Sequence, residues 1–227
     1  MLQQMIRLIA RLEPQEPTDM LQESLAIASF PSEPEALLRQ ELGEHRRAFE
    51  ATAQMLTQPF TETLEILEHG VRGGGKLLLF GNGGSAADAQ HIAAELIIRY
   101  KANRAPISAI ALTTDSSALT ACANDLGFDA LFERQIEGLG RKGDVAVGIS
   151  TSGNSANVLR GLGKARTMGM RTVGLTGGSG GQMHGLCDAL IIVPSLVTAR
   201  IQEMHITIGH VLCKALEQRL GLVQVGP

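Results

Sequence analysis

Short apolar runs alternate with helical stretches through the second two-thirds of the sequence, and this alternation limits the fold more than any other feature. A strand that is apolar throughout is buried on both faces, which is typical of a parallel sheet covered by helices. The predicted strands lie at 76–80, 109–112, 144–149, 171–175 and 189–193. The predicted helices between and after them lie at 85–98, 116–123, 129–139, 155–168 and 198–220.

The alternation predicts an α/β fold, a three-layer sandwich with a five-stranded, mostly parallel sheet of the flavodoxin-like or Rossmann-like kind. Ligands of such sheets bind at the carboxyl ends of the strands. Helices precede the sheet: residues 35–70 predict one long helix, broken or kinked near Pro59, after short helices near 1–12 and 18–28. The long helix is too large for one face of the sheet, so we expect it and the 198–220 helix to pack against partner subunits.

Composition excludes several classes of protein. The chain has 227 residues, enough for one domain with a real core, and its net charge of −3 without a basic stripe argues against nucleic-acid binding. The three cysteines are far apart and lack CxxC spacing, as in a reducing cytoplasm. Arg7 and Arg11 interrupt the apolar N-terminal positions, and no apolar run approaches the length of a membrane span. We therefore expect a soluble, cytoplasmic protein that does not interact with membranes.

Residues 150–155 join a predicted strand to a predicted helix and are rich in hydroxyl groups. A helix start offers free backbone N–H groups and the positive end of the helix dipole, which together favour a phosphate. The segment contains no lysine or arginine, so neutral donors would hold the anion, which suits a small phosphorylated metabolite that must leave again. An ordinary helix cap is the alternative, but it explains only Asn154 or Ser155. The donors are Ser150, Thr151, Ser152 and Ser155.

The first predicted strand leads into a second glycine-rich turn, Gly81 to Ala86. Its glycines permit close approach of the backbone to a ligand, and Ser85 can cap the following helix. The pattern G-x-G-x-x-A also fits a dinucleotide-binding turn. However, the next strand region ends at Asp115, about 30 residues on rather than about 20, and residues 150–155 would be left without a role. A sugar phosphate bound by both turns uses more of the sequence.

Two helices carry residues suited to acid–base or metal chemistry. His91 and Glu95 are four residues apart, so they lie on one helix face, where they could bind a divalent metal, transfer protons or form a solvated pair. Gln202 and His210 on the last helix are eight residues apart, which corresponds to about 80° around the axis and about 12 Å along it. Their apolar neighbours in sequence predict a buried face. His205 falls on another face, where we expect a structural role.

Four ordered motifs, GNGGSAADAQHIAAEL, ACANDLGF, GDVAVGISTSGNSANV and ARIQEMHITIGH, resemble the sugar-isomerase (SIS) domain of the bacterial phosphoheptose isomerase family. The resemblance covers residues 35–222, which leaves 1–34 as an N-terminal extension without an assigned function and 223–227 as a tail. It implies isomerisation of sedoheptulose 7-phosphate to D-glycero-D-manno-heptose 7-phosphate, for lipopolysaccharide or other surface glycans. It also implies a homotetramer that binds zinc.

Carried over residue by residue, the resemblance implies that Glu95 is the general base and His210 the general acid. It implies one zinc ion per subunit, held by His91, Glu95, Gln202 and His210. The substrate-binding positions that it implies are Asn82, Gly83, Gly84, Ser85, Glu95, Asn124, Asp125, Ser150, Thr151, Ser152, Ser155 and Gln202. The chain departs from many family members at Ala86 and Ala87, where those often carry bulkier polar residues.

The residue types suit this chemistry. An aldose–ketose exchange moves a proton between adjacent carbons through an enediol, which requires a carboxylate base and a partner that handles the oxygen protons. A metal or a hydrogen-bond donor such as Gln202 would stabilise the enediolate oxygen. Metal coordination lowers the basicity of a carboxylate, so the zinc could be catalytic, structural or adventitious. Because Gln202 and His210 lie far apart along one helix, we expect a site completed by a neighbouring chain, unless both side chains lean together.

Two other functions are compatible with the same pattern. A non-catalytic SIS protein that binds a partner, such as the DnaA initiator-associating protein, shares ARIQEMH; the resemblance predicts that such relatives lack the equivalents of Glu95 and His210, which this chain keeps. An isomerase of another sugar phosphate, such as arabinose 5-phosphate, is the second. The helix around residues 201–210 argues against it, although the sequence does not define the length of the sugar.

Overall fold

Five parallel strands form the sheet that the apolar runs predicted, in the order β2-β1-β3-β4-β5. The computed structural model describes residues 33–223, so the predicted helices near 1–12 and 18–28 and residues 224–227 of the predicted tail lie outside the described residues. The chain divides after Glu41, and the sheet belongs to the unit that begins at Leu42. The strands are β1 Leu77–Gly81, β2 Ala109–Ala111, β3 Val145–Ser150, β4 Arg171–Gly177 and β5 Ala189–Val193.

Helices follow the strands as the sequence predicted, with boundaries within two residues of those expected. They are α5 Gly84–Ile97, α6 Ser116–Asp125, α7 Leu131–Leu139, α8 Ala156–Thr167 and α9 Thr198–Arg219, with short 3-10 turns at Phe128–Ala130 and Gly181–Met183. Within residues 33–223, no helix is both long and apolar enough to cross a membrane.

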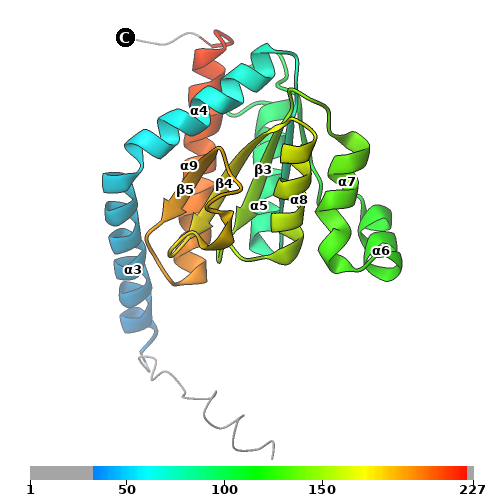
Figure 1. Cartoon of the computed structure of the whole chain (residues 1–227). Coiled ribbons are helices and arrows are strands. Elements are labelled where there is room, and N and C mark those ends of the chain that lie inside the picture. Colours follow the sequence, from blue (N-terminus) through cyan, green and yellow to red (C-terminus); the bar gives the residue numbers. More distant parts are fainter. Residues whose placement is uncertain (1–32, 224–227) are drawn as a thin grey trace, which may run out of the picture. The chain divides into compact units, whose positions relative to one another are not determined.

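The sheet separates two layers of helices (Figure 1). Successive residues of a strand point to opposite faces. Leu77 and Leu79 of β1 accordingly join a core with residues of α4 (Thr57–Arg72), α5 and α9, whereas Leu78 and Phe80 join a core with residues of α6, α7 and α8. The alternation of the two cores along one strand confirms the predicted three-layer sandwich.

The helix predicted over residues 35–70, broken or kinked near Pro59, is present with its break. The structure has two helices, α3 Pro34–Met55 and α4 Thr57–Arg72, and the chain breaks at Leu56 rather than at Pro59. In a continuous helix the ring of Pro59 would clash with the carbonyl four residues earlier, that of Met55. The new helix therefore begins before the proline, which lies in the first turn of α4, where a missing N–H group costs nothing.

The strand order places the ends of β1 and β3 side by side, with Gly81 opposite Ile149. The chain continues from β1 towards β2 on one side and from β3 towards β4 on the other. This is the flavodoxin-like order, in which the reversal between β1 and β3 opens a crevice for ligands at the carboxyl ends of these strands. The two turns that the sequence analysis singled out both lie at this point.

Candidate active site

The turn between β1 and α5 requires glycine at two positions. Gly83 has φ +55°, a left-handed conformation that glycine adopts readily. A Cβ atom at Gly81 would lie 2.7 Å from the carbonyl oxygen of Ile149 on the neighbouring strand. These glycines bring the start of α5 close to the end of β3, while Ser85 is buried at the first turn of the helix.

Residues 150–155, which we call the hydroxyl loop, leave the start of α8 open. Ser155 is the N-cap residue of α8, but its side chain accepts no capping hydrogen bond. Its hydroxyl lies 2.8 Å from that of Ser150 instead, and Ser152 Oγ accepts a hydrogen bond from the N–H group of Asn154. The side chain of Ser155 therefore does not cap the first backbone N–H groups of α8. This favours an anion-binding role for the loop over the alternative of an ordinary helix cap.

A pair of asparagines joins the two turns. The side-chain amides of Asn82 and Asn157 exchange two hydrogen bonds, of 2.8 and 2.9 Å. Asn157 lies in the first turn of α8 and is buried. The sequence analysis missed Asn157, although an amide side chain in an apolar first turn is a signal for such a role. The pair sets the position of the hydroxyl loop relative to the β1–α5 turn, and it occupies the amide of Asn82, a predicted substrate ligand.

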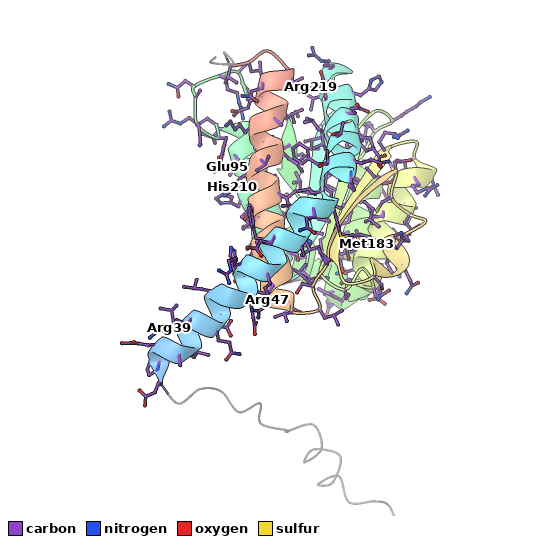
Figure 2. All side chains as sticks on the ribbon, turned by 90° about the vertical axis from the view of Figure 1, so that its left-hand side faces the viewer. Arg39, Arg47, Glu95, Met183, His210 and Arg219 are labelled. Atoms are coloured by element: carbon purple, nitrogen blue, oxygen red, sulfur yellow. The ribbon has the colours of Figure 1, made fainter. Side chains whose placement is uncertain are left out.

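His91, Glu95 and His210, which we call the histidine cluster, lie together between α5 and α9. The Nε2 atoms of His91 and His210 are 2.8 Å apart, and His91 Nε2 is 3.5 Å from Glu95 Oε1. One ligand atom from each residue lies within 4.8 Å of the others. Figure 2 shows Glu95 and His210 beside each other along α9. Within the described residues, this is the one group of three histidine, cysteine or acidic side chains with metal-binding spacing.

The close approach of α5 and α9 brings the cluster together. A Cβ atom at Gly209 would lie 2.6 Å from Cδ1 of Ile92, so the glycine lets the Ile92 side chain pack directly against the backbone of α9. Gly209 precedes His210 and Ile92 follows His91, so the same contact sets the two imidazoles against each other. The helices run in the same direction, since Gly84 contacts Gln202 at one end and Tyr100 contacts Glu217 beyond the other.

Gln202 does not join the histidine cluster within one chain. Its amide lies against Gly84, where an added Cβ atom would be 2.4 Å from Nε2 of Gln202. The predicted buried face is also wrong, because Gln202 and His210 are only half-buried. Residues adjacent in sequence point about 100° apart around a helix. The apolar neighbours of Gln202 and His210 therefore form a different face of α9, and that face is the buried one. Buried residues on that face include Ile201, Met204, His205 and Ile208.

Asn124 and Asp125 also lie away from the cluster. They are the last two residues of α6, and both are exposed. The side-chain amide of Asn124 donates a 2.7 Å hydrogen bond to the carboxylate of Asp125. α6 lies on the other side of the sheet from α9 (Figure 1), since its buried Cys122 belongs to the core on the opposite face. Asp125 borders a groove of about 340 Å³ between α6 and α7.

Asp88 is a further ionisable group that the sequence analysis missed. It precedes His91 by three residues, so the two share a face of α5. Burial raises the pKa of Asp88 to about 6, an effect that the charge of His91 partly offsets. Within the described residues, its buried Oδ2 atom has no hydrogen-bond partner. A carboxylate without a partner adds negative charge beside the histidines and favours a cation there.

His205 has the structural role that its position predicted. It is fully buried, and its Nε2–H group donates a 3.1 Å hydrogen bond to the carbonyl oxygen of Thr176 at the end of β4. Burial lowers the pKa of His205 to about 4, so the ring is neutral at physiological pH. The contact ties α9 to the strand beside the hydroxyl loop.

Comparison with known proteins matches the profile of the SIS domain to residues 42–177. The chain is 56% identical to the phosphoheptose isomerase of Paramagnetospirillum magneticum over 180 residues, 79% of this chain and 94% of that protein. It is 54% identical to the phosphoheptose isomerase of Aquifex aeolicus over 168 residues, 74% of this chain and 88% of that protein.

Solved structures of two phosphoheptose isomerases have the same fold as this chain. The phosphoheptose isomerase from Neisseria gonorrhoeae is 43% identical with a TM-score of 0.75, and the match covers 80% of this chain and 97% of that one. The phosphoheptose isomerase from Francisella tularensis is 35% identical with a TM-score of 0.77, over 80% of this chain and 96% of that one.

Proposed function

We infer that this chain, which belongs to the phosphoheptose isomerase family of SIS-domain proteins, converts sedoheptulose 7-phosphate to D-glycero-D-manno-heptose 7-phosphate. The observation that carries the inference is the histidine cluster, which brings Glu95 and His210 together from two helices of one chain. Nothing in the geometry or in these relatives favours a non-catalytic binding protein. The product would supply heptose for lipopolysaccharide or other surface glycans.

The hydroxyl loop would bind the phosphate group. Ser150, Thr151, Ser152 and Ser155 offer hydroxyl donors, and the start of α8 adds backbone N–H groups and the positive end of its dipole. The β1–α5 turn lies beside it through the asparagine pair, so the sugar would extend from one turn to the other. Hydrogen bonds from neutral groups to a charged phosphate contribute about 1.5–3 kcal/mol each.

Glu95 and His210 would carry the proton transfers. Glu95 removes a proton from C1 of the ketose, and His210 donates one to the carbonyl oxygen on C2, which forms the enediol. His210 then takes the proton of the C1 hydroxyl while Glu95 returns its proton to C2, which leaves the aldose and both residues in their starting states. General acid–base groups in such positions contribute about 10²–10⁴-fold each to the rate.

The cluster fits a zinc ion. Two imidazole nitrogens and a carboxylate oxygen are common zinc ligands, and three protein ligands with one open position are typical of catalytic zinc. The unpartnered Oδ2 of Asp88 adds negative charge beside them. His91, Glu95 and His210 would hold the ion, which would supply Lewis-acid polarisation of a sugar oxygen. With the ion bound, Glu95 and His210 would transfer protons only through the atoms it leaves free, the second carboxylate oxygen of Glu95 and the other ring nitrogen of His210. Gln202 lies about 12 Å along α9 from His210, so a ligand role for Gln202 requires the amide of a neighbouring subunit.

We propose a homotetramer with sites shared between subunits. Two observations support sharing: Gln202 does not reach the cluster of its own chain, and Asn124 and Asp125 lie on the other side of the sheet. Exposed apolar side chains also remain on α5 and α9 and beside them, including Ile97, Ile98 and Val211.

Mixing inactive variants tests the sharing. Glu95 and His210 lie together in one chain, so mixtures of Glu95→Gln and His210→Gln proteins should stay inactive after subunit exchange. A mixture of Glu95→Gln and Gln202→Ala should recover part of the activity, because one chain then supplies the cluster and the other the amide. Recovery in the first mixture, or none in the second despite proven exchange, would contradict this arrangement.

A coupled turnover assay tests the function itself. Sedoheptulose 7-phosphate should be isomerised faster than five- and six-carbon ketose phosphates, with Glu95→Gln protein as the blank. Faster turnover of a shorter sugar would assign the enzyme to another phosphosugar.

A further inference from the structure

The imidazole of His210 lies between two rings. Tyr100 stacks on one side, with ring centroids 5.4 Å apart and planes 28° apart, and His91 meets the imidazole edge-on at 5.0 Å and 71°. Stacked and edge-to-face contacts are the favourable geometries of ring pairs. The Tyr100 contact defines the plane of the imidazole, while the 2.8 Å approach of the two Nε2 atoms defines its rotation within that plane.

Tyr100 is itself held in place by a buried ion pair. Its backbone N–H group donates to Oε1 of Glu217 at 3.2 Å, and Nε of Arg104 donates to the same oxygen at 2.8 Å. The side chains of Arg104 and Glu217 are 0% and 3% exposed. Glu217 lies on α9 seven residues after His210, two turns along the same helix. Glu217, which anchors Tyr100, and His210, which Tyr100 contacts, therefore belong to one rigid helix.

The same arginine fixes the end of α5. Arg104 donates to the carbonyl oxygen of Glu95 at 2.8 Å and to that of Leu96 at 2.6 Å. The last turn of a helix leaves such carbonyl groups without partners inside the helix, and that of Leu96 also accepts a hydrogen bond from the N–H group of Ile107. One buried guanidinium thus orders the backbone of Glu95 and, through Glu217, the backbone of Tyr100.

We propose that Tyr100 is a positioning residue for the isomerisation: its ring, anchored by the Arg104–Glu217 pair, holds the His210 imidazole turned towards Glu95. This inference rests on the proposed function, in which His210 and Glu95 act on adjacent atoms of one sugar. Misplacement of a reacting group by about 1 Å costs about 10²-fold in rate. Within the described residues, the Tyr100 hydroxyl makes no hydrogen bond, so the ring alone carries the effect.

Two substitutions separate the ring from the hydroxyl. Tyr100→Phe keeps the stack and should retain kcat within about twofold, whereas Tyr100→Leu should lower kcat about 10- to 100-fold with KM changed far less. Unfolding temperatures should stay close to that of the unmodified protein, and Tyr100→Met replaces the leucine variant if that variant does not fold. Full kcat in the non-aromatic variant, or an equal loss in Tyr100→Phe, would overturn the proposal.

A spectroscopic readout keeps the test independent of turnover. In protein labelled with 13C at histidine Cε1, the His210 resonance, assigned with His210→Gln, should lose its ring-current shift in the non-aromatic variant and keep it in Tyr100→Phe. An unmoved resonance would contradict the stack. If the unmodified enzyme fails to turn over sedoheptulose 7-phosphate, the proposed function fails, while the resonance still decides whether Tyr100 positions His210.

Discussion

The hydroxyl loop comes from one continuous turn of chain, whereas the histidine cluster joins two helices whose histidines are 119 residues apart in sequence. In the loop, local geometry suffices: a strand ends, a helix begins, and the hydroxyl groups between them share the start of the helix. In the cluster, one pair is local, His91 and Glu95, and its third member arrives only because two helices pack closely. The proposed phosphate site is therefore locally encoded, whereas the proposed catalytic site depends on tertiary packing.

The largest effect should come from the base. Glu95→Gln keeps the shape of the side chain but removes its basicity, so kcat should fall about 10²–10⁴-fold while substrate binding changes little. Steady-state kinetics and calorimetric titration with sedoheptulose 7-phosphate measure the two quantities. Glu137→Gln, an exposed change on α7, is the control. Near-normal turnover by Glu95→Gln would remove the cluster from the mechanism.

The hydroxyl loop should show the opposite pattern. Replacing Ser150 and Ser152 with alanine removes two hydroxyl donors, each contributing about 1.5–3 kcal/mol to binding of a charged phosphate, so KM should rise about 10²-fold or more. kcat should change far less. Ser116→Ala, an exposed change at the start of α6, serves as the control. If KM stays at its original value, the phosphate binds elsewhere.

Gly209→Ala tests the packing on which the cluster depends. The added Cβ atom would meet Cδ1 of Ile92 at 2.6 Å, so the Ile92 side chain must move or the two helices must separate, and we expect a loss of about 1–3 kcal/mol in unfolding free energy together with lower kcat. Gly163→Ala in α8 is the matched control, because nothing lies within 4 Å of its added Cβ atom. That substitution should stabilise the helix by up to about 1 kcal/mol. Equal behaviour of the two variants would show that close helix packing is not required.

The burial of His205 makes the stability of the protein depend on pH. The pKa of buried His205 is about 4, below the value of about 6.5 in an unfolded chain, so the unfolded state binds its proton first as the pH falls. This contribution is present above pH 6.5 and is lost progressively between pH 6.5 and pH 4. His205→Gln should therefore weaken the pH dependence of the unfolding temperature in this interval, whereas exposed His69→Gln should not. Identical pH profiles for both variants would contradict the role assigned to burial.

The sequence by itself determined the architecture and the local parts of the site. Continuous apolar runs can be buried only in a covered parallel sheet, and the hydroxyl loop needs only the chain direction to be placed at the end of β3. The spacing of His91 and Glu95 likewise follows from the helix repeat. Pro59 predicted a break in the helix. The break lies at Leu56 because the ring of Pro59 would clash with the carbonyl group four residues earlier in a continuous helix.

Tertiary structure alone decided the rest. Gly209 is one of 26 glycines in the sequence, and nothing local marks it as the contact that brings His210 to His91. The partner of Asn82 could not be read from spacing, nor could the separation of Gln202 from the cluster, because side-chain contacts between elements depend on how those elements pack. The stack of Tyr100 on His210 is another contact between elements that the sequence does not reveal. Local patterns fix which groups each element carries, and the distances between elements fix which of those groups act together.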